Sequence, residues 1–382
     1  MKNDNHLIDQ FKSGHFEKGV GFKYFVPNEI NKEWVTADPI LLTLLEKASI
    51  KLGGLNSFSK LVPNLNLFIQ LHVLKEAVIS SRIEGTQTNI DEALLPVEEV
   101  DPKRKNDWLE VHNYTMALNE SIELLKTLPL SSRLLREAHR TLLSGVRGEH
   151  KMPGEFRTSQ NWIGGASLND AVFIPPAKHF VDPLMGDLEN FLHNTDIHVP
   201  SLIRIGIAHY QFETIHPFLD GNGRIGRLMI TLFLVSEGIL DVPLLYLSTF
   251  FEKNKSLYYD NLTNVREKDD MLQWLKYFLI GIEETSTIAL NTLSTVLQLK
   301  TKLEIEAHSE LGRRAPNGLK LLHELFKTPI VSVKEVETIC DLSTKAANDL
   351  VKLLQEKGWL TQLGGSVRYR FFTFSPYLNL FK

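Results

Sequence analysis

Apolar residues recur at helical spacing through most of this 382-residue chain. Leu228, Met229, Leu232 and Phe233 illustrate the pattern, because steps of three and four residues place side chains on one face of an α-helix. Glycines, prolines and polar stretches separate such segments, which predicts helices over Asn64–Ile83, Asn106–Leu125, Ser131–Leu143, Asp182–Asn194, Ser201–Thr214, Arg224–Val235 and Glu283–Leu311. We therefore expect an all-α fold.

The N-terminal part follows this pattern less clearly. Residues 1–35 contain aromatic side chains without a regular period, so we expect an irregular arm that lies against the body of the protein. Asp38, followed by a proline, is expected to open a helix that continues through Ala48. Gly53 and Gly54 then predict the close of the segment after this helix.

One internal segment departs from the helical pattern. Residues 154–176 combine glycines with β-branched residues, which predicts two short extended pieces. A polar loop over Ala166–Ala171 would join them. We expect a small β-hairpin within the helical protein.

The C-terminal part has its own order of elements. Gly312–Gly318 breaks the preceding helix and marks a boundary. After it, the pattern predicts helices over Leu319–Phe326, Val333–Ile339 and Thr344–Lys357, the last capped by Ser343, and two extended pieces around Gly364-Gly365. This order resembles a winged helix.

A winged helix suggests DNA as one partner, through Lys345, Asn348 and Lys352 on its third helix. However, residues 315–370 hold eight Lys and Arg against six Asp and Glu, a weak excess for binding phosphates. Contact with a protein or a second copy of the chain explains the module equally well.

Net charge, cysteine content and the lengths of apolar runs limit which partners and compartments we expect for the chain. The formal net charge of -4 gives no general attraction to nucleic acid or anionic membranes. The one cysteine, Cys340, excludes an internal disulfide and a cysteine-based zinc site. Residues 1–19 lack the apolar core of a signal peptide, and the apolar run Leu228–Val235 is too short to cross a bilayer. We expect a cytoplasmic protein without a membrane partner.

The densest polar chemistry lies in the twelve residues His-Pro-Phe-Leu-Asp-Gly-Asn-Gly-Arg-Ile-Gly-Arg, from His216 to Arg227. The Gly221–Gly223 turn can direct successive backbone N–H groups toward one anion. The helix that follows adds its N-terminus, which also favours an anion. This combination predicts a phosphate site.

The charged residues of the same stretch extend that interpretation. Arg224 and Arg227 are one helical turn apart and could hold the outer phosphates of a nucleotide. Asp220 offers the hard oxygen that Mg²⁺ prefers beside phosphates, and His216 remains as a proton acceptor. A zinc site with His209 is an alternative, which we discount because no second motif completes the ligand set.

This stretch resembles the signature of the Fic family, His-x-Phe-x-Asp/Glu-Gly-Asn-Gly-Arg-x-x-Arg, and meets every fixed position. The resemblance implies a protein adenylyltransferase that moves AMP from ATP to a Ser, Thr or Tyr hydroxyl and releases pyrophosphate. By the same resemblance His216 is the general base, Asp220 binds Mg²⁺, the glycine turn holds the α-phosphate, and Arg224 and Arg227 hold the β- and γ-phosphates.

A second motif lies at the end of the helix over residues 64–85. Ser80, Glu84 and Gly85 occupy the fixed places of the Fic inhibitory motif Ser/Thr-x-x-x-Glu-Gly/Asn. The resemblance implies that Glu84 pairs with Arg227 and blocks the γ-phosphate site. Breaking a buried ion pair costs about 3–5 kcal/mol, so the inhibition would be firm.

The resemblance extends to the hairpin at residues 154–176 and to a pair of tyrosines. The hairpin resembles the Fic flap, which docks the target as an added strand. Tyr258 and Tyr259 resemble the residues beside adenosine, although adjacent helical residues point in different directions. The family's nearby Asn contact falls on Arg266 by spacing, with Asn264 as the nearest candidate.

The residues that the resemblance places at ATP are Glu84, Ile163, Gly164, His216, Asp220, Gly221, Asn222, Gly223, Arg224, Ile225, Gly226, Arg227, Tyr258 and Tyr259. It divides the chain into an N-terminal region (1–105), a catalytic domain (106–311) and a winged-helix-like domain (312–382). It also implies self-modification and a homodimer. Two alternatives stay open, namely removal of AMP with Glu84 as the base for water, and a nucleotide-sensing regulator that binds DNA.

Overall fold

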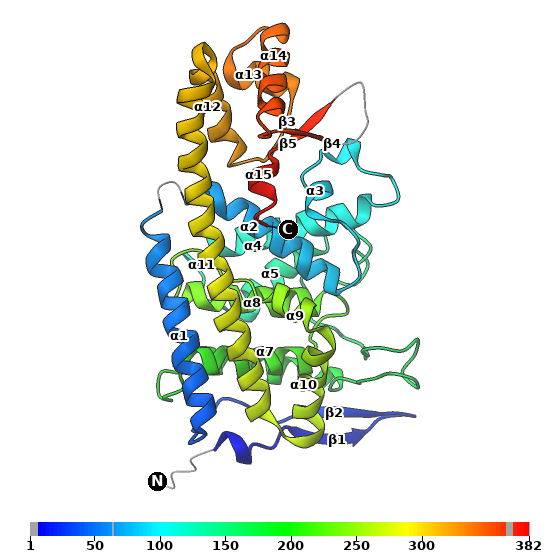
Figure 1. The fold of residues 1–382 in the computed structure, drawn as a ribbon. Coiled ribbons are helices and arrows are strands. Elements are labelled where there is room, and N and C mark those ends of the chain that lie inside the picture. Colours follow the sequence, from blue (N-terminus) through cyan, green and yellow to red (C-terminus); the bar gives the residue numbers. More distant parts are fainter. Residues whose placement is uncertain (1–6, 63–64, 364–369, 382) are drawn as a thin grey trace.

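The computed structural model describes residues 7–62, 65–363 and 370–381. The expected helix start at Asn64 and the expected turn at Gly364-Gly365 lie outside these ranges. Within them the protein is mostly helical, as the hydrophobic pattern predicted, and Figure 1 shows one long helix running along the side of a bundle of shorter ones.

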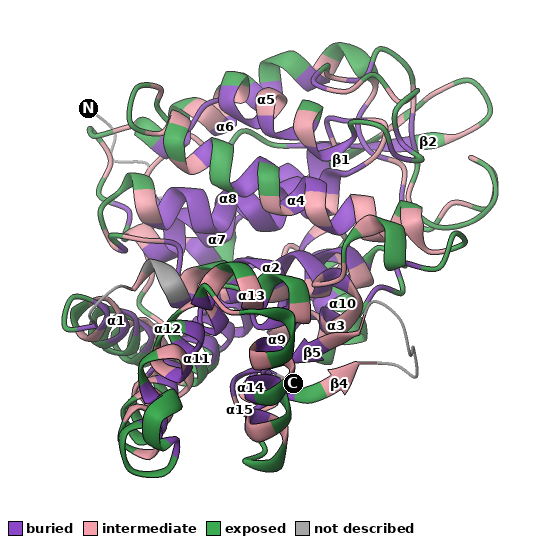
Figure 2. Cartoon of the chain, turned by 90° about the horizontal axis from the view of Figure 1, so that it is seen from above, coloured by how far each residue is buried: buried purple, intermediate pink, exposed green. Residues whose placement is uncertain are grey.

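Two consecutive helices form the centre of the molecule, α7 (Ser201–Ile215) and α8 (Asn222–Ser236). Every residue of α7 after its first is buried, and most of α8 is buried too, so both helices appear purple in Figure 2. A helix that is covered on all sides has little freedom to shift. The loop between them, which carries the predicted phosphate site, is therefore anchored at both ends.

The surrounding helices and short turns enclose this centre. They are α2 (Asn66–Ile83), α3 (Ile90–Ala93), η2 (Val97–Glu99), α4 (Lys105–Leu124), α5 (Ser132–Leu142), η3 (Lys178–Phe180), α6 (Val181–His193), α9 (Ser248–Lys253) and α10 (Lys255–Lys268). One continuous cluster of buried apolar side chains joins them. No helix in the described part of the chain is long and apolar enough to span a membrane.

Two longer helices pack side by side along this bundle, α1 (Pro39–Ser59) and α11 (Met271–Glu310) (Figure 1). Asp38 caps α1 as predicted, with its carboxylate accepting a hydrogen bond from the Leu41 N–H at 2.7 Å. The predicted end of the segment at Gly53-Gly54 is wrong, because α1 continues to Ser59. Leu52 and Leu55 are buried there, and this packing outweighs the roughly 1 kcal/mol cost of a helical glycine.

Helix α11 has 40 residues and is therefore about 60 Å long. It begins at the Asp270 cap, earlier than the predicted Glu283, and carries the chain from the central bundle to the C-terminal part. The predicted break at Gly312–Gly318 is shorter than expected. It comprises η4 (Gly312–Arg314), after which α12 (Ala315–Leu325) begins at once.

In the described residues after η4, the C-terminal part has four helices beside a three-stranded antiparallel sheet. Its elements after α12 are β3 (Ile330–Ser332), α13 (Val333–Cys340), α14 (Thr344–Glu356), β4 (Thr361–Leu363), β5 (Phe371–Thr373) and α15 (Ser375–Leu378), with strand order β3-β5-β4. Ser343 caps α14 as predicted. Strand β3 and helix α15 were not predicted, and the identification of this part as a winged helix stays a prediction.

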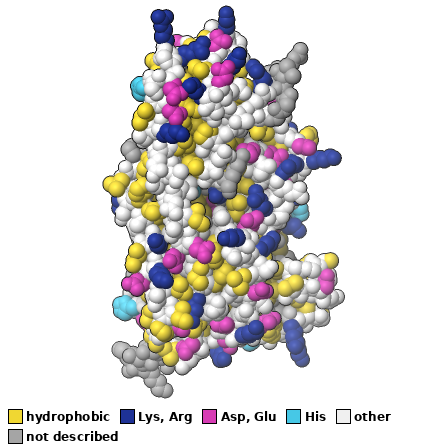
Figure 3. Space-filling model, in the orientation of Figure 1, with side chains coloured by type: hydrophobic (Ala, Val, Ile, Leu, Met, Phe, Trp, Pro, Cys, Tyr) yellow, Lys and Arg dark blue, Asp and Glu magenta, His cyan; other side chains and the backbone are white. Residues whose placement is uncertain are grey.

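The surface of α14 bears on the DNA hypothesis. Lys345 and Lys352 are exposed, but the Asn348 side chain accepts a hydrogen bond from Arg370 at 2.8 Å. On the face drawn in Figure 3, basic and acidic side chains are interspersed rather than gathered by sign. DNA binding stays a prediction that this face does not strengthen.

The prediction of an irregular N-terminal arm is wrong. After η1 (Ile8–Gln10), the chain forms an antiparallel hairpin from β1 (Gly14–Lys18) and β2 (Lys23–Pro27). Phe25 on β2 is buried and donates its N–H to the Ile174 carbonyl at 3.0 Å, so the hairpin lies against the segment predicted as the flap. Nearly every β2 side chain is buried, so the sequence lacks the alternation of apolar and polar residues by which a half-exposed strand is recognised.

Candidate functional site

Helix α7 delivers His216 to the loop. Its N–H donates to the Phe212 carbonyl at 2.9 Å, and its φ of 51° lies in the left-handed region. A non-glycine residue in this conformation costs about 1–3 kcal/mol and persists only where the surroundings fix it. His216 is therefore held in a set direction at the end of a buried helix.

Two side chains from the flap segment fix the His216 loop. Arg157 donates from Nε to the His216 carbonyl at 2.9 Å, and its own N–H donates to the Pro217 carbonyl at 2.8 Å. Asn161 donates to the Phe218 carbonyl at 2.9 Å. Within the described residues Arg157 has no carboxylate partner, and burial lowers its pKa to about 10. Its guanidinium donates hydrogen bonds to backbone carbonyls instead, so Arg157 positions the His216 loop.

Two further side chains close the loop from within. Asn222 exchanges two hydrogen bonds with the Phe218 backbone, both at 2.8 Å. His139 of α5 lies between the loop and the flap segment, with Nε2 3.0 Å from the Asp220 carbonyl and Nδ1 accepting the Gly154 N–H at 2.8 Å. Only the neutral tautomer with hydrogen on Nε2 satisfies both contacts. His139 is fully buried and also positions the loop.

The His216 imidazole is suited to accept a proton. Its Nδ1 lies 3.4 Å from the Glu213 carbonyl, which can only accept, so the ring hydrogen belongs on Nδ1. Burial lowers the pKa of His216 to about 4, which keeps the ring neutral near pH 7. Nε2 then offers its lone pair, the arrangement that general base catalysis requires.

The predicted anion nest begins helix α8. Gly221 has a φ of 76°, and α8 starts at Asn222 without a side-chain cap on its N-terminal N–H groups. These donors are therefore available to an anion. At Gly223 a Cβ atom would meet the Glu84 carboxylate and the Arg227 guanidinium, so a larger residue would displace the ends of these side chains and glycine permits their close approach.

Glu84 and Arg227 lie together, as the resemblance implied. Arg227 Nη2 is 2.7 Å from Glu84 Oε1, while its Nε donates to Ser80 Oγ at 2.9 Å. Burial alone would raise the pKa of Glu84, but the Arg227 charge holds it below its ordinary value. The Arg227 side chain is 2% exposed and that of Glu84 34% exposed. The pair is thus half-buried, and the 3–5 kcal/mol expected for a fully buried pair is too large.

Arg224 has a different partner, which the sequence did not indicate. Its Nη1 is 2.9 Å from Glu110 Oε2 on α4, and both side chains are less than a tenth exposed. Arg147 shares Glu110 at 2.8 Å. The two motif arginines are therefore aimed by carboxylates from two different helices, α4 and α2.

Asp220 is the candidate Mg²⁺ ligand. Its Oδ1 accepts the Gly221 N–H at 2.6 Å, and its side chain is 45% exposed beside the nest. One carboxylate next to phosphate oxygens fits Mg²⁺, which keeps several waters. Within the described residues, no three His, Cys, Asp or Glu side chains group as a metal site.

The zinc alternative at His209 finds no support in its surroundings. His209 Nδ1 lies 3.0 Å from the Gly226 carbonyl, and Nε2 lies 2.9 Å from the Tyr258 hydroxyl. Tyr258 is 1% exposed, whereas Tyr259 is 40% exposed. Neighbouring helical residues point about 100° apart, so Tyr258 packs in the core while Tyr259 faces outward, and of the two Tyr259 is the one placed to reach a nucleotide.

The flap segment pairs through one antiparallel bridge. Ile163 donates to and accepts from the strand at Phe173, and Gly164 next to it is exposed with a φ of 69°. The Arg266 guanidinium lies 3.9 Å from the centre of the Phe173 ring. Arg266, at the position expected for the family's Asn, therefore supports the flap.

Comparisons with known proteins agree with this geometry. Residues 42–123 match the model of the Fic/DOC family N-terminal region, and residues 129–234 match that of the Fic/DOC family. A Fic family protein from Desulfovibrio desulfuricans has a similar structure, with a TM-score of 0.57 over 90% of this chain and 98% of that one, at 20% identity. The predicted helical Fic fold is confirmed.

Two curated relatives are named as adenylyltransferases. "Protein adenylyltransferase Fic" of Drosophila melanogaster is 26% identical over 56% of this chain and 41% of its own length. A "probable protein adenylyltransferase" of Aquifex aeolicus is 29% identical over 47% of this chain and 52% of its own length. The chain thus spans about half or less of these relatives. The chain therefore contains a Fic/DOC family N-terminal region at residues 42–123 and a Fic/DOC family domain at residues 129–234.

Proposed function

We propose that the chain is a self-inhibited protein adenylyltransferase, which transfers AMP from ATP to a protein hydroxyl of Ser, Thr or Tyr. The observation that carries the proposal is His216 at the mouth of the glycine nest. Its ring is neutral, its Nδ1 is engaged with the Glu213 carbonyl, and its Nε2 has a lone pair to offer. A hydroxyl between this nitrogen and a phosphate in the nest would be ready for in-line attack.

In the proposed reaction the hydroxyl oxygen bonds to the α-phosphorus of ATP. The bond from that phosphorus to the oxygen bridging the β-phosphate breaks, and pyrophosphate leaves with the electron pair. His216 Nε2 takes the hydroxyl proton. The N–H groups of Gly221–Gly223 would hold the α-phosphate, and Arg224 and Arg227 would hold the outer phosphates.

Asp220 is the residue that would hold Mg²⁺. The ion, when bound, would neutralise charge that develops on the phosphate oxygens. The rest of the loop keeps its shape without it, because Arg157, Asn161 and Asn222 bind its carbonyl groups. Donors and cations that are held in place before the phosphates bind supply most of the acceleration in phosphoryl-type transfer.

Self-inhibition is supported by the position of Glu84. Its carboxylate lies against Gly223 and takes the Arg227 Nη2 donor at 2.7 Å. A γ-phosphate cannot use the same donor while the pair persists. Helix α2 would have to shift, or Glu84 to rotate away, before ATP could occupy the site in a reactive pose.

Target recognition is proposed to use the flap backbone. Ile163 lies on the flap, and the following residues Gly164 to Ser167 are largely exposed. An extended target segment could add beside this strand by main-chain hydrogen bonds. Such docking reads few side chains, which is consistent with modification of the protein itself in addition to other targets.

Removal of AMP by the same site is the second candidate, with Glu84 as the base for water. The Arg227 charge keeps the pKa of Glu84 below its ordinary value, although burial acts in the opposite direction. A carboxylate with a lowered pKa is ionised near pH 7, as the neutral His216 ring is unprotonated, so charge state does not separate the two reactions. Glu84 Oε1, however, is occupied by Arg227. This contact favours transfer over hydrolysis.

The experiment that tests the proposal is intact-mass measurement after incubation with Mg·ATP. We expect Glu84→Gly to gain one or more AMP groups, and Glu84→Gly/His216→Ala to gain none. Lys47→Met, which changes an exposed charge on α1, is the matched control and should behave as wild type. Equal labelling of the Glu84→Gly variant and the double variant would overturn the role of His216.

A further inference from the structure

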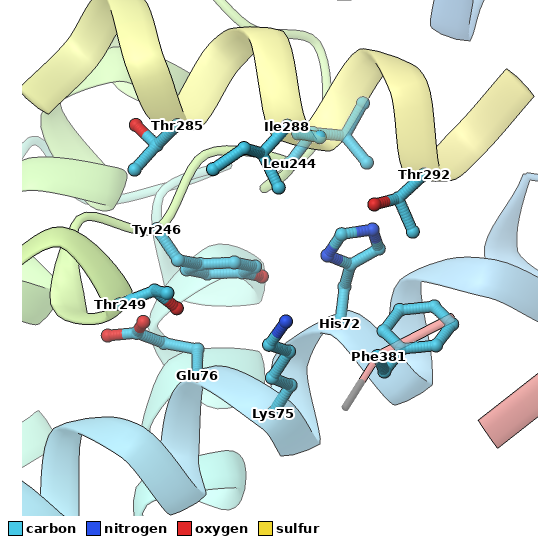
Figure 4. A pocket seen from close by; sticks show the side chains of 11 residues that line it. His72, Lys75, Glu76, Leu244, Tyr246, Thr249, Thr285, Ile288, Thr292 and Phe381 are labelled. Atoms are coloured by element: carbon cyan, nitrogen blue, oxygen red, sulfur yellow. The ribbon is translucent and has the colours of Figure 1, made fainter. Parts of the chain in front are cut away.

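Three carboxylate side chains are buried within the described ranges, those of Glu76, Glu110 and Glu213. Glu110 forms its ion pair with Arg224. Glu76 lies at the edge of the cavity that Figure 4 shows, and its Oε1 accepts a hydrogen bond from the Tyr114 hydroxyl at 3.0 Å. Each of these two carboxylates therefore has a partner within the protein.

Glu213 differs from both, because its carboxylate has neither a hydrogen bond nor an ion pair within the described residues. Glu213 is 7% exposed, and its Oε1 is fully buried without a partner. Burial raises its pKa to about 7, although the charges of Arg227 and Arg266 act in the opposite direction. Arg227 pairs with Glu84 instead, and Arg266 lies against the flap. Buried polar groups are ordinarily hydrogen-bonded, so this unpaired acceptor points to a ligand that donates.

The Glu213 carboxylate faces the first turns of α8. His209, one turn earlier on α7, contacts the Gly226 carbonyl at 3.0 Å and the Tyr258 hydroxyl at 2.9 Å, so this face of α7 is directed at α8 and α10. Glu213 Oε1 lies against Gly226, where an added Cβ atom would be 2.3 Å from it. Glu213 is therefore close to the glycine nest, on the side of the helix that carries Tyr259.

ATP offers few donors to such an acceptor. Its phosphates only accept hydrogen bonds, so the donors are the ribose hydroxyls and the adenine amino group. Gly226 lies one helical turn, about 5.4 Å, beyond Gly223 of the nest, which is close to the separation between the α-phosphorus and the hydroxyls of the attached sugar. The base would lie farther out, beside Tyr259. Dinucleotide-binding folds also use a carboxylate to accept a hydrogen bond from ribose.

We propose that Glu213 binds the sugar of the donor nucleotide, and that its carboxylate accepts a hydrogen bond from the 2′- or the 3′-hydroxyl. The site then selects ribonucleotides over deoxynucleotides, because a nucleotide without this hydroxyl leaves a buried acceptor unpaired. The inference rests on the proposed function, since it takes ATP as the donor and the nest as the seat of the α-phosphate.

Sugar selection is tested by calorimetric titration of Glu84→Gly/His216→Ala with the magnesium complexes of ATP, 2′-deoxy-ATP and 3′-deoxy-ATP. In this protein Arg227 is free and transfer is blocked, and at pH 8 Glu213 is ionised. One deoxynucleotide should bind about ten- to a hundredfold more weakly than ATP, since a hydrogen bond to a charged group is lost. Adding Glu213→Ala should weaken ATP by a similar factor and bring the three Kd values together.

The matched control is Glu267→Ala, which removes an exposed carboxylate from α10 and should keep the discrimination. Equal affinity for the three nucleotides, or discrimination that persists in Glu213→Ala, would overturn the inference. If Glu213→Ala does not fold, Glu213→Gln answers the same question, because its neutral side chain keeps the size and should reduce the discrimination. Unchanged discrimination in Glu213→Gln would then overturn the sugar contact.

The proposed function is tested separately, by AMP transfer from ATP in Glu84→Gly. Discrimination that depends on Glu213, without any transfer, would defeat the proposed function and leave the sugar contact standing. Transfer without discrimination would defeat the sugar contact alone. The His216 imidazole is not disturbed by these substitutions, because it contacts the backbone carbonyl of Glu213 and not its side chain.

Discussion

The two motif arginines lie one turn apart on α8, yet their surroundings differ. Arg224 pairs with Glu110 from the middle of α4, and both side chains are less than a tenth exposed. Arg227 pairs with Glu84 at the end of α2, where the carboxylate is about a third exposed. The same pair of charges is thus a fixed support in one region and a releasable contact in the other.

The fixed region is held by more than one contact. Glu110 also binds Arg147, which reaches Asp107 at 2.7 Å as well. Removing Glu110 would leave a buried guanidinium without its carboxylate. This network aims Arg224 before any nucleotide arrives.

The releasable region depends on a helix terminus. Glu84 is the C-terminal cap of α2, and Gly85 after it has a φ of 107°. Arg227 keeps two hydrogen bonds to Ser80 if Glu84 leaves. Departure of Glu84 therefore leaves Arg227 with two close hydrogen bonds, whereas without Glu110 the Arg224 guanidinium would keep only Asp220 Oδ1, at 3.8 Å. An arginine–carboxylate pair can therefore either hold a side chain in place for a ligand or block a site until it opens. Burial and the position of the carboxylate on its helix decide between the two.

The largest expected difference between the two regions is in stability. Glu110→Ala should lower the free energy of unfolding by about 3–5 kcal/mol, as found for buried pairs that lose one partner. Glu84→Ala should change it by about 1 kcal/mol or less, because the pair is half-exposed. Urea unfolding followed by circular dichroism measures both, and equal losses would remove the distinction between the regions.

Buried carboxyls without an arginine partner should respond to pH with the opposite sign to Glu84. Burial raises the pKa of Glu213 to about 7, and its Oε1 has no hydrogen bond. A raised folded-state pKa means that Glu213 destabilises the protein progressively as pH rises from about 4.5 to 7. Glu213→Gln removes this penalty. Its gain in free energy of unfolding over wild type should therefore be about 2–3 kcal/mol larger at pH 8 than at pH 5.

Glu84 provides the comparison for that measurement. Its folded-state pKa is lowered by Arg227 although burial opposes this, so its contribution to stability is present above the ordinary pKa of 4.5. The contribution is lost as pH falls through the lowered value. Glu84→Gln should cost stability at pH 8 and lose its effect at acidic pH. Parallel pH profiles for Glu84→Gln and Glu213→Gln would contradict the assignment of their charge states.

A smaller effect is expected from the contact that closes the end of α2. Lys255 Nζ donates to the Ile83 carbonyl at 2.6 Å, one residue before Glu84. Lys255→Met should loosen this terminus and raise self-labelling about two- to tenfold, less than Glu84→Gly does. Lys253→Met on the neighbouring helix turn is the matched control, and an equal rise there would indicate a general charge effect.

Much of the helical fold and the pairing of Glu84 with Arg227 could be predicted from the sequence. Helical spacing is a local signal, whereas the pairing was implied only by the resemblance of the two motifs to those of the Fic family. Glu110, Arg157 and His139 could not be assigned their roles, because they act through tertiary contacts that no spacing encodes. Arg157 in particular binds backbone carbonyls, which leave no mark on the sequence of their partners.

The errors have similar physical causes. Gly53 and Gly54 were expected to close their segment, but packing of α1 against α11 carries the helix past them. The β1–β2 hairpin was missed because its inner strand is buried on both sides. Tyr258 was expected at a nucleotide, whereas its hydroxyl bonds to the buried His209. In each case the tertiary environment outweighs the local pattern.

The most direct test of the account is self-labelling of wild type and Glu84→Gly with ATP that carries a radioactive phosphorus at either the α- or the γ-position. We expect incorporation from the α-position alone, with a higher rate in Glu84→Gly because Arg227 is free. Incorporation from the γ-position, or equal α-labelling of the two proteins, would contradict it.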